Sequence, residues 1–372
     1  MGTAGSVDLV VSSGPITPAP TGASSREEIV RLAAGATPLP SPVEAYFEVA
    51  NRCNSKCATC PLTFSPQEAA RQLSIEEFIA LVEQLPDLQR AVLQGIGEPL
   101  LNRDLARMIA HLKQRGVYVV FNTNAALLTH RRQVELIDSG LDELRVSLDS
   151  STPETYLKVR GIPVFDRVVA NLGEMMRTRR SLEARKPRIS IWMTGLRENL
   201  GELPDVIDLA GRLGVDEVYL QRMVYWGEGL ATSEQSIYAG APGASEASEV
   251  EVEIEAIIAE AERRAARHGL GFRGADARPP RASLLERGAE QEPWRACSRP
   301  LRLAYITAQG TALPCCIAPF TDAPFESIQL GNYLQHGVAS VWNGEAYRRF
   351  RKQLYSSEPP AACRNCGLAW SL

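Results

Sequence analysis

The sequence predicts a parallel α/β sheet covered by helices, followed by a small cysteine-rich C-terminal domain. Short apolar strands alternate with amphipathic helices between residues 43 and 223, and five of the eight cysteines lie beyond residue 290. Each strand is nearly continuous in apolar residues, which is typical of parallel strands buried on both faces. Because parallel crossovers are right-handed, six such units would curl into a partial or open (β/α)6 barrel.

Six strands are expected to form the sheet, at residues 43–49, 90–95, 117–124, 143–150, 188–195 and 216–223. Helical periodicity lies between them, at residues 74–85, 105–116, 131–140, 164–178 and 203–214. Ser74 followed by Glu77 predicts a capping box at the first helix, and Gly116 predicts the end of the second. In such sheets, ligands bind in the loops that follow the carboxyl ends of the strands.

The chain is expected to divide into four regions. Residues 1–40, rich in Gly, Ser, Thr, Pro and Ala, predict a disordered leader, and residues 41–226 contain the barrel. Residues 227–292 predict a linker and one charged helix (249–269) with a solvated surface. Residues 293–372 form the cysteine-rich domain.

Composition argues against two classes of partner. The net charge of −4 gives no electrostatic reason to bind nucleic acid or an anionic membrane. No apolar run reaches the roughly 18 residues needed to span a bilayer, and the N-terminal stretch lacks the basic residues that open a signal peptide. We therefore expect a cytoplasmic protein, whose clustered thiols bind metal rather than form disulfides.

Cys53, Cys57 and Cys60 form the first candidate metal site. At this cysteine content, chance would place Cys-x3-Cys-x2-Cys in such a chain about 0.004 times. Three thiolates without a nearby histidine do not complete a tetrahedral zinc site. They can hold three irons of a [4Fe–4S] cluster and leave the fourth iron open to an exchangeable ligand. The loop follows the first strand, so it is expected at the ligand-binding edge of the sheet.

At these residues the sequence resembles the radical S-adenosylmethionine (radical SAM) superfamily, in which this loop follows the first strand of a partial (β/α)6 barrel. The resemblance implies that SAM chelates the open iron and is cleaved to a 5′-deoxyadenosyl radical, which abstracts a substrate hydrogen atom. An electron donor such as flavodoxin or ferredoxin would supply the electron. The resemblance also implies SAM contacts at the ends of strands two to four, from Gly97, Glu98, Asn124, Ser147 and Asp149.

The C-terminal cysteines form the second candidate site. Cys297, Gly310 and Cys315 are spaced Cys-x12-Gly-x4-Cys, and Cys363 and Cys366 follow as Cys-x2-Cys. This order resembles the Twitch domain, the short form of the SPASM extension of some radical SAM enzymes. The resemblance implies an auxiliary [4Fe–4S] cluster on the four cysteines, and hence two clusters in all. A zinc knuckle is the alternative, although zinc prefers tighter spacings.

A fully ligated auxiliary cluster cannot bind substrate but can accept an electron. This favours oxidation of a secondary alcohol. The resemblance to Twitch enzymes implies that the substrate is a small carbohydrate or aminocyclitol intermediate of natural-product biosynthesis. Arg222, at the end of strand six, is the candidate general base, and Arg160 is a poorer one because a helix-end arginine is usually exposed. Cys316 is expected to be a small buried residue beside a ligand; a hydrogen-atom donor or an alternative ligand are the other interpretations.

Three other functions stay open. A redox-neutral decarboxylase or epimerase acting on a sugar would use the same radical. A maturase of ribosomally made peptides (RiPPs) is the nearest rival, although such enzymes often carry a leader-binding module and two auxiliary clusters. A non-catalytic iron–sulfur electron carrier would need neither the three-cysteine loop nor a SAM site.

Overall fold

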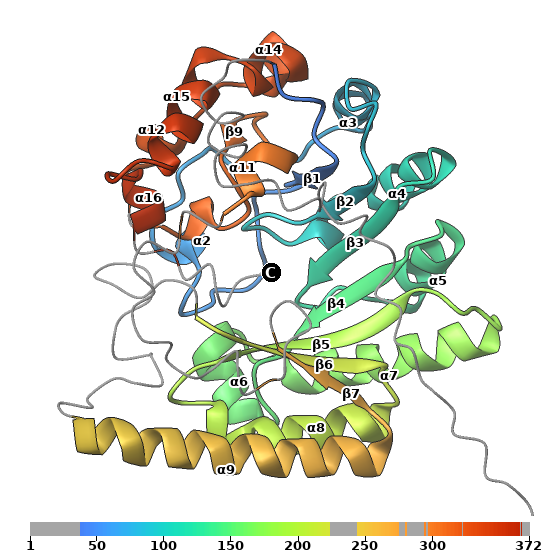
Figure 1. Ribbon diagram of the computed structural model, residues 1–372. Coiled ribbons are helices and arrows are strands. Elements are labelled where there is room, and N and C mark those ends of the chain that lie inside the picture. The colour runs from blue at the N-terminus through green and yellow to red at the C-terminus, as the bar shows by residue number, and fades with distance from the viewer. Residues whose placement is uncertain are drawn as a thin grey trace, which may run out of the picture.

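The computed structural model describes residues 38–223, 244–274, 297–321, 323–364 and 366, with the single residues 280 and 294. Within these residues one sheet has the strand order β7-β6-β5-β4-β3-β2-β1-β8-β9 (Figure 1). Neighbouring strands are parallel except β8 and β9. The strands are β1 (Glu44–Phe47), β2 (Arg90–Leu93), β3 (Tyr118–Thr123), β4 (Glu143–Ser147), β5 (Arg188–Gly195), β6 (Glu217–Arg222), β7 (Gly271–Arg273), β8 (Leu303–Ile306) and β9 (Ala312–Leu313). The predicted α/β class with a parallel sheet is confirmed.

Helices cover one face of the sheet and continue into the C-terminal part (Figure 1). Along the sheet lie α3 (Ile75–Glu83), α4 (Leu105–Gln114), α5 (His130–Asp138), α7 (Phe165–Ser181), α8 (Leu203–Leu213) and α9 (Ala244–His268). Shorter helices near the strand ends are α2 (Pro61–Phe64), η1 (Pro99–Leu101), α6 (Pro153–Arg160) and η2 (Leu200–Glu202). The C-terminal part adds α11 (Arg299–Arg302), η6 (Ala318–Phe320), α12 (Phe325–Ile328), α13 (Tyr333–His336), α14 (Val338–Trp342), α15 (Glu345–Leu354) and α16 (Ala361–Arg364). None of the helices in the described ranges is both long enough and apolar enough to cross a membrane.

The expected helix ends are confirmed where local chemistry defines them. Ser74 Oγ accepts a hydrogen bond from the Glu77 amide (3.2 Å), and the Glu77 carboxylate accepts one from the Ser74 amide (3.0 Å). This reciprocal pair is the capping box at the start of α3. Beyond α4, Gly116 adopts φ +72°, a left-handed conformation that glycine tolerates best.

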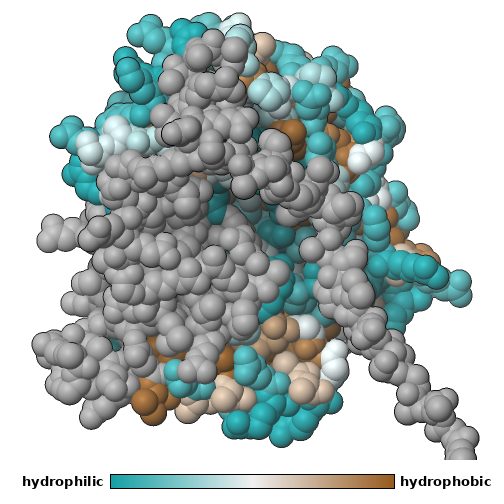
Figure 2. Space-filling model, in the orientation of Figure 1, coloured by the Kyte–Doolittle hydropathy of each residue, from teal (hydrophilic) through white to brown (hydrophobic). Residues whose placement is uncertain are grey.

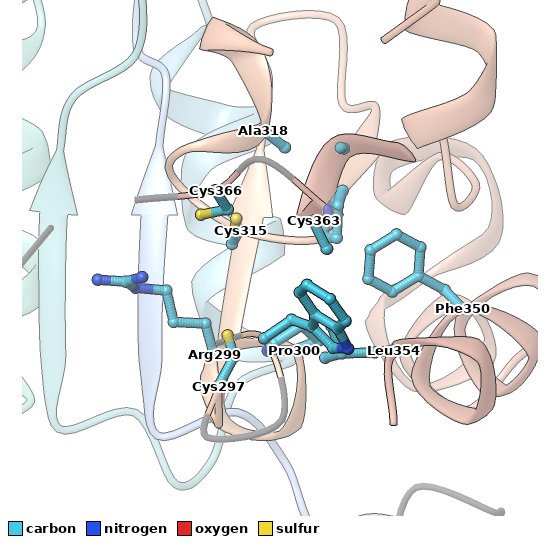
Figure 3. Close-up of a pocket in the computed structure, with 12 residues that line it drawn as sticks. Cys297, Arg299, Pro300, Cys315, Ala318, Phe350, Leu354, Cys363 and Cys366 are labelled. Atoms are coloured by element: carbon cyan, nitrogen blue, oxygen red, sulfur yellow. The ribbon is translucent and has the colours of Figure 1, made fainter. Parts of the chain in front are cut away.

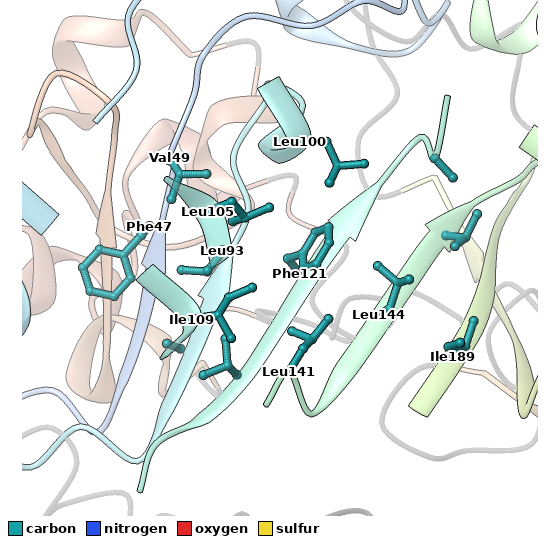
Figure 4. Packing of buried hydrophobic residues seen from close by; sticks show 14 of the residues in the cluster. Phe47, Val49, Leu93, Leu100, Leu105, Ile109, Phe121, Leu141, Leu144 and Ile189 are labelled. Atoms are coloured by element: carbon teal, nitrogen blue, oxygen red, sulfur yellow. The ribbon is translucent and has the colours of Figure 1, made fainter. Parts of the chain in front are cut away.

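The two faces of the sheet carry different side chains, because successive residues of a strand point to opposite sides. Phe47, Leu93, Phe121 and Leu144 join the apolar cluster beneath the helices (Figure 4). Their strand neighbours on the other face are largely polar or aromatic, such as Arg145. The helix-covered face therefore supplies most of the core, and the opposite face contributes a smaller buried cluster that includes Tyr46, Val92 and Leu303.

Of the predicted linker and charged helix, the structure describes residues 244–274 and 280, and one face of the helix is buried rather than solvated. Ile254, Ile258, Ala261 and Ala265 are buried on one face of α9, which packs against α8. Their spacing of four, three and four residues forms a helical stripe inside a strongly charged sequence. After α9 the chain adds β7, which pairs in parallel with β6. The rest of this predicted region, residues 275–292, lies outside the described residues apart from residue 280.

The C-terminal part joins the same sheet as the barrel strands. β8 pairs in parallel with β1 from Glu44↔Leu303 to Phe47↔Ile306. The expected leader, residues 1–40, lies outside the described residues up to position 37. Its last residues differ from the prediction of disorder, since the Leu39 amide donates to Asn343 Oδ1 (2.8 Å).

Candidate functional site

The three-cysteine loop leaves the carboxyl end of β1 and ends at α2, whose N-cap is Cys60. Two backbone hydrogen bonds attach it to the end of α6: Lys56 N to Arg160 O (3.2 Å) and Ala58 N to Val159 O (2.9 Å). Gly161 follows with φ +70°, and a Cβ there would overlap the Lys56 carbonyl. The loop is therefore held against a helix that comes a hundred residues later in the chain.

Each cysteine sulfur of this loop is approached by a different segment. Asn124 Nδ2, after β3, lies 3.7 Å from Cys53 Sγ. Arg160 Nη1, at the end of α6, lies 3.8 Å from Cys57 Sγ. Cys60 Sγ lies 3.9 Å from the carbonyl oxygen of Ile96, after β2. The loops that follow β2 and β3, and the helix that follows β4, therefore meet at the three thiols.

The chemistry of these thiols fits a cationic ligand. Burial raises the pKa of Cys53, and burial with the neighbouring Cys57 raises the pKa of Cys60 to about 12. Buried thiols of this kind ionise readily only when a metal takes the place of the proton. Three sulfurs on one loop leave a coordination position open, as the sequence predicts.

The segment after β2 contacts the cysteine loop directly. A Cβ at Gly97 would overlap the Ala50 carbonyl oxygen, and the Glu98 amide donates to Arg52 O (2.8 Å). The Glu98 carboxylate accepts hydrogen bonds from Thr123 Oγ1 (2.7 Å), and from the amides of Asn124 (2.8 Å) and Leu100 (3.0 Å). Glu98 thus joins the ends of β2 and β3; its predicted contact with the SAM amino group stays a prediction.

Burial raises the pKa of Glu98, although its hydrogen-bond donors oppose that shift. Asn124 also holds the cysteine loop, donating Nδ2 to Asn54 Oδ1 (2.9 Å) and Ser55 Oγ (3.1 Å). Ser147 ends β4 half-buried, with its Cα paired to that of Trp192. Gly97, Glu98, Asn124 and Ser147 therefore lie on consecutive strand ends, and their roles toward SAM stay predictions.

Asp149 and Arg160 form a buried ion pair of 2.6 Å. Asp149 Oδ1 also accepts the Thr194 amide (2.8 Å), and Asn199 Nδ2 donates to the Asp149 carbonyl (2.9 Å). The pKa of Asp149 is raised by burial, with Arg160 opposing the rise. Asp149 therefore positions Arg160 beside Cys57, and its predicted contact with SAM stays a prediction.

The expectation that Arg160 is exposed at a helix end is wrong. Its side chain is only 14% exposed, because Gly161 turns the chain under the cysteine loop and the guanidinium points inward. Arg160 Nε is buried, and no group in the described part of the chain accepts a hydrogen bond from it. A buried guanidinium with a free N–H beside the three thiols is a binding group for an anionic ligand. The sequence signal was Gly161, whose left-handed conformation directs the preceding arginine.

Arg222, the predicted general base, ends β6 with its Cα paired to that of Gly195. Its side chain lies outside the described part of the structure, so its role stays a prediction. Nearby on the same strand, Gln221 Nε2 donates to Thr194 Oγ1 (3.3 Å).

Sequence reasoning missed a stack of four side chains on the polar face of the sheet. Arg145 lies over the Trp192 ring at 4.2 Å, Trp192 stacks on Tyr219 at 3.9 Å, and Arg273 lies 4.6 Å from the Tyr219 ring. They come from β4, β5, β6 and β7, and alternation within each strand is the signal that could have found them. Figure 2 shows hydrophilic residues gathered in the hollow at the centre of this side of the molecule.

Arg145 forms hydrogen bonds on one side of its guanidinium group only, as far as the described residues show. It donates Nε and Nη2 to the Glu143 carboxylate (2.8 and 3.2 Å), whereas its Nη1, on the opposite side of the guanidinium, is buried and has no hydrogen-bond partner among the described residues. Asn122, paired to Arg145 in register, likewise has a buried Oδ1 to which none of the described residues donates a hydrogen bond. A free donor and a free acceptor therefore lie side by side on this face.

The four C-terminal cysteines line one pocket (Figure 3). Cys297 precedes α11, Cys315 follows β9, and Cys363 lies in α16, close to Cys366. The pocket is otherwise mostly apolar, lined by Trp294, Pro300, Pro314, Ala318, Phe350, Leu354 and Ala362, with Arg299 as the charged member. The structure thus brings together all four residues of the predicted auxiliary site.

Backbone amides reach two of these sulfurs. The Arg299 amide donates to Cys297, and the amides of Ile317 and Ala318 donate to Cys315. Burial raises the pKa of both thiols. In the described residues, no three Cys, His, Asp or Glu side chains are grouped around the position of a single metal ion. The cysteines of a cubane each bind a different iron, so a four-iron cluster does not require such a group.

Cys316 turns away from this pocket. It packs with the apolar cluster that contains Tyr46 and Leu303, and it forms a side-chain hydrogen bond with Tyr46. Burial raises its pKa to about 11. This position is that of a packed residue beside a ligand, as the sequence indicated; its other interpretations stay untested.

Two family models match the chain. The radical SAM superfamily model matches residues 47–218, which include the three-cysteine loop and the ends of β1 to β5, and an iron–sulfur cluster-binding (SPASM) domain model matches residues 297–367. The chain belongs to the radical SAM superfamily and carries a SPASM domain. Its cofactors are accordingly S-adenosyl-L-methionine and iron–sulfur clusters.

Curated relatives of this radical SAM protein extend across both domains. It is 25% identical over 342 residues to the PqqA peptide cyclase of Bradyrhizobium diazoefficiens, covering 87% of this chain and 78% of the relative. It is also 25% identical over 327 residues to the PqqA peptide cyclase of Rhodopseudomonas palustris, covering 87% and 79%. The alignment therefore includes the connection between the two domains.

Solved structures share the fold. Streptococcus suis SuiB bound to S-adenosylmethionine has a TM-score of 0.62 at 16% identity, covering 84% of this chain and 68% of SuiB. SuiB bound to its precursor peptide SuiA has a TM-score of 0.63 at 15% identity, covering 92% and 73%. At these identities the likeness shows the fold alone.

Proposed function

We propose that this radical SAM enzyme modifies a peptide, forming a new bond after abstraction of a hydrogen atom from a peptide carbon. The observation that carries the proposal is the alignment to two PqqA peptide cyclases over 87% of the chain, through both domains. This favours the peptide-maturase alternative of the sequence analysis over oxidation of a carbohydrate alcohol, which none of these relatives supports. The expected small-molecule substrate is replaced by a peptide.

The chemistry divides between the cofactors and the chain. When bound, SAM and the iron–sulfur clusters supply the radical and carry the electrons. The chain's own residues would bind and orient. Arg160, held by Asp149, offers a free N–H to an anionic group beside Cys57, and Asn124 fixes the loop from the other side.

On the polar face of the sheet, Arg145 and Asn122 present a free donor and a free acceptor side by side. Such a pair matches a peptide group, which carries one N–H and one C=O. The stacked Trp192 and Tyr219 add an apolar surface next to it. We propose that these side chains contact the substrate peptide near the site of hydrogen abstraction.

Several predictions of the sequence analysis continue as parts of this proposal. Cys53, Cys57 and Cys60 would hold the SAM-binding [4Fe–4S] cluster, and Cys297, Cys315, Cys363 and Cys366 an auxiliary [4Fe–4S] cluster. Flavodoxin or ferredoxin would supply the electron, and the enzyme would act in the cytoplasm. Arg222 stays the candidate base.

The test is to co-express the chain with each short peptide encoded beside its gene and to measure the peptide masses. Bond formation between two C–H carbons removes two hydrogen atoms, so the product is lighter by about 2 Da per new bond. With a peptide deuterated at the reacting carbon, deuterium should appear in 5′-deoxyadenosine.

The matched control is the same assay with an aminocyclitol that carries a secondary alcohol. Unchanged peptides together with an alcohol converted to a ketone would overturn the proposal and restore the alcohol oxidation. Deuterium transfer from the peptide, without transfer from the alcohol, would support it.

A further inference from the structure

Arg299 occupies an unusual position beside the C-terminal cysteines. It begins α11 two residues after Cys297 and lines the same pocket as the four cysteines. Figure 3 shows Arg299 and Phe350 on opposite sides of Cys315 and Cys363. One side of the pocket is therefore charged, and the other is aromatic and aliphatic.

The side chain of Arg299 shares its pocket with thiols rather than with carboxylates. Cys297, Cys315, Cys363 and Cys366 line the pocket with it, and none of its described lining residues is Asp or Glu. None of the carboxylates in the described part of the chain forms an ion pair with it. Its helix neighbour Arg302 differs, because its Nη2 lies 3.0 Å from the Glu44 carboxylate.

The apolar surroundings of Arg299 screen its charge only weakly. Pro300, Pro314, Leu354 and Ala362 line the remaining pocket wall, and apolar groups screen a charge far less than water does. The Arg299 amide also donates to the Cys297 sulfur. A single residue thus places a positively charged side chain in the wall of the cysteine pocket and a backbone N–H beside Cys297.

We propose that Arg299 raises the reduction potential of the cluster held by Cys297, Cys315, Cys363 and Cys366. Reduction adds one negative charge, and a nearby guanidinium without a carboxylate partner stabilises the reduced state more than the oxidised state. Net charge and hydrogen bonds to the sulfurs are among the factors that set the potential of such clusters. Arg299 would therefore keep this cluster ready to accept an electron from the reaction. The inference rests on the proposed auxiliary cluster and is independent of the identity of the substrate.

The first cysteine loop supplies an internal contrast. Arg160 also lies beside a cysteine, at 3.8 Å from Cys57 Sγ, but its charge is matched by Asp149 at 2.6 Å. Arg299 has no such partner among the described residues. Among the described residues, therefore, the arginine beside the first set has a carboxylate partner and the arginine beside the C-terminal set has none.

The test is an anaerobic redox titration of the reconstituted full-length enzyme, followed by electron paramagnetic resonance. The Cys53/Cys57/Cys60→Ala variant identifies which signal belongs to the C-terminal cluster. Arg299→Gln should move its midpoint to a more negative potential. A tenfold weaker reduction, the change we expect, corresponds to about 59 mV for a one-electron couple. Arg299→Lys keeps the charge and should recover most of the shift.

The matched control is Arg302→Gln, which removes the same charge from the same helix beside Glu44. It should shift the midpoint much less. Should Arg299→Gln fail to retain the cluster, Arg299→Met keeps the aliphatic stem and serves as the second neutral variant. An unchanged midpoint in the neutral variants, or an equal shift in Arg302→Gln, overturns the proposal. Iron and sulfide content shows whether the C-terminal cysteines bind a cluster at all. If they bind none, the proposal for Arg299 is also overturned. The peptide assay, which tests the proposed function, would be unaffected by that result.

Discussion

The two cysteine sets of this molecule are built in opposite ways. Cys53, Cys57 and Cys60 lie within eight residues on one loop, and segments that follow β2, β3 and β4 contact this loop. The second set is drawn from both ends of a 70-residue segment, from Cys297 to Cys366, and closes around a mostly apolar pocket. Three sulfurs on one loop leave one iron of a cubane open to an exchangeable ligand, whereas four sulfurs around one pocket leave none open.

The arginines beside the two cysteine sets also differ in their partners. In the first set Arg160 is neutralised by Asp149 and presents one free N–H. In the second, Arg299 faces the thiols without a carboxylate partner among the described residues. The first arrangement suits recognition of a bound anion, and the second suits control of electron affinity.

The largest effect should come from removing the first set. In the Cys53/Cys57/Cys60→Ala variant we expect iron to fall from about eight to about four per chain, and formation of 5′-deoxyadenosine to be abolished. The reason is that only this loop leaves an iron open for SAM. Iron, acid-labile sulfide and 5′-deoxyadenosine are measured after anaerobic reconstitution.

The matched variant is Cys363/Cys366→Ala in the second set. It should also lose about four irons, yet still cleave SAM when reduced, because the first loop is intact. If both variants lost SAM cleavage equally, the division between an open and a closed set would be wrong. If iron fell from about four to none in the first variant, the C-terminal cysteines would hold zinc or no metal.

The first cysteine set was predictable from the sequence because its information is local. The spacing of three cysteines after an apolar strand identifies both the loop and its edge of the sheet. The polar residues at the next strand ends, such as Asn124, were predictable for the same reason. The second set required a resemblance, since 47 residues separate Cys315 from Cys363 and nothing local brings them together.

The remaining features depend on tertiary packing. β7 has three residues, too few to show a strand pattern, and it exists because it pairs with β6. Arg160 was expected at the surface because helix-end arginines usually lie there. Its burial follows from the turn at Gly161 and the charge of Asp149, which periodicity does not report. The Arg145–Trp192–Tyr219–Arg273 stack likewise needs four strands in register.

The second largest effect concerns the arginine of the first set. Arg160→Gln leaves Asp149 buried without its counter-charge, and breaking such a buried pair costs about 3–5 kcal/mol of unfolding free energy. The same change removes the N–H groups offered to an anionic ligand, so SAM affinity should fall as well. Anaerobic denaturant unfolding and equilibrium binding of SAM measure the two effects.

Lys158→Gln is the control for this change, on the same helix. Lys158 pairs with Glu198 at 2.6 Å, but its side chain is 66% exposed, and exposed pairs contribute about 0–1 kcal/mol. Equal losses of stability in the two variants would contradict the assignment of Arg160 to a buried pair. Stability lost without any change in SAM affinity would limit Arg160 to a structural role.

The smallest effect on stability is expected at Glu48, where the barrel strands meet the C-terminal part. Glu48, at the end of β1, accepts hydrogen bonds from the Ile96 amide (2.9 Å) and the Ala308 amide (3.1 Å). Ile96 precedes Gly97 beside the first cysteine set, and Ala308 follows β8 of the C-terminal part. Burial raises the pKa of Glu48 to about 7, although the two amides oppose that shift. The carboxyl group is therefore more easily protonated in the folded state than in the unfolded chain.

The sign of the pH dependence follows from this shift. Since the folded pKa is above the unfolded value, the contribution of Glu48 to stability is complete below about pH 4.5 and is lost as the pH rises through about 7. Relative to Glu48→Gln, the wild type should lose up to about 3 kcal/mol between pH 4.5 and 8. Asp142→Asn is the control, because its lysine and backbone hydrogen bonds outweigh burial and lower the pKa of Asp142. Its effect should not change from pH 5 to 8. If the difference in unfolding free energy between wild type and Glu48→Gln also stays constant from pH 5 to 8, Glu48 is ionised in the folded state throughout this range.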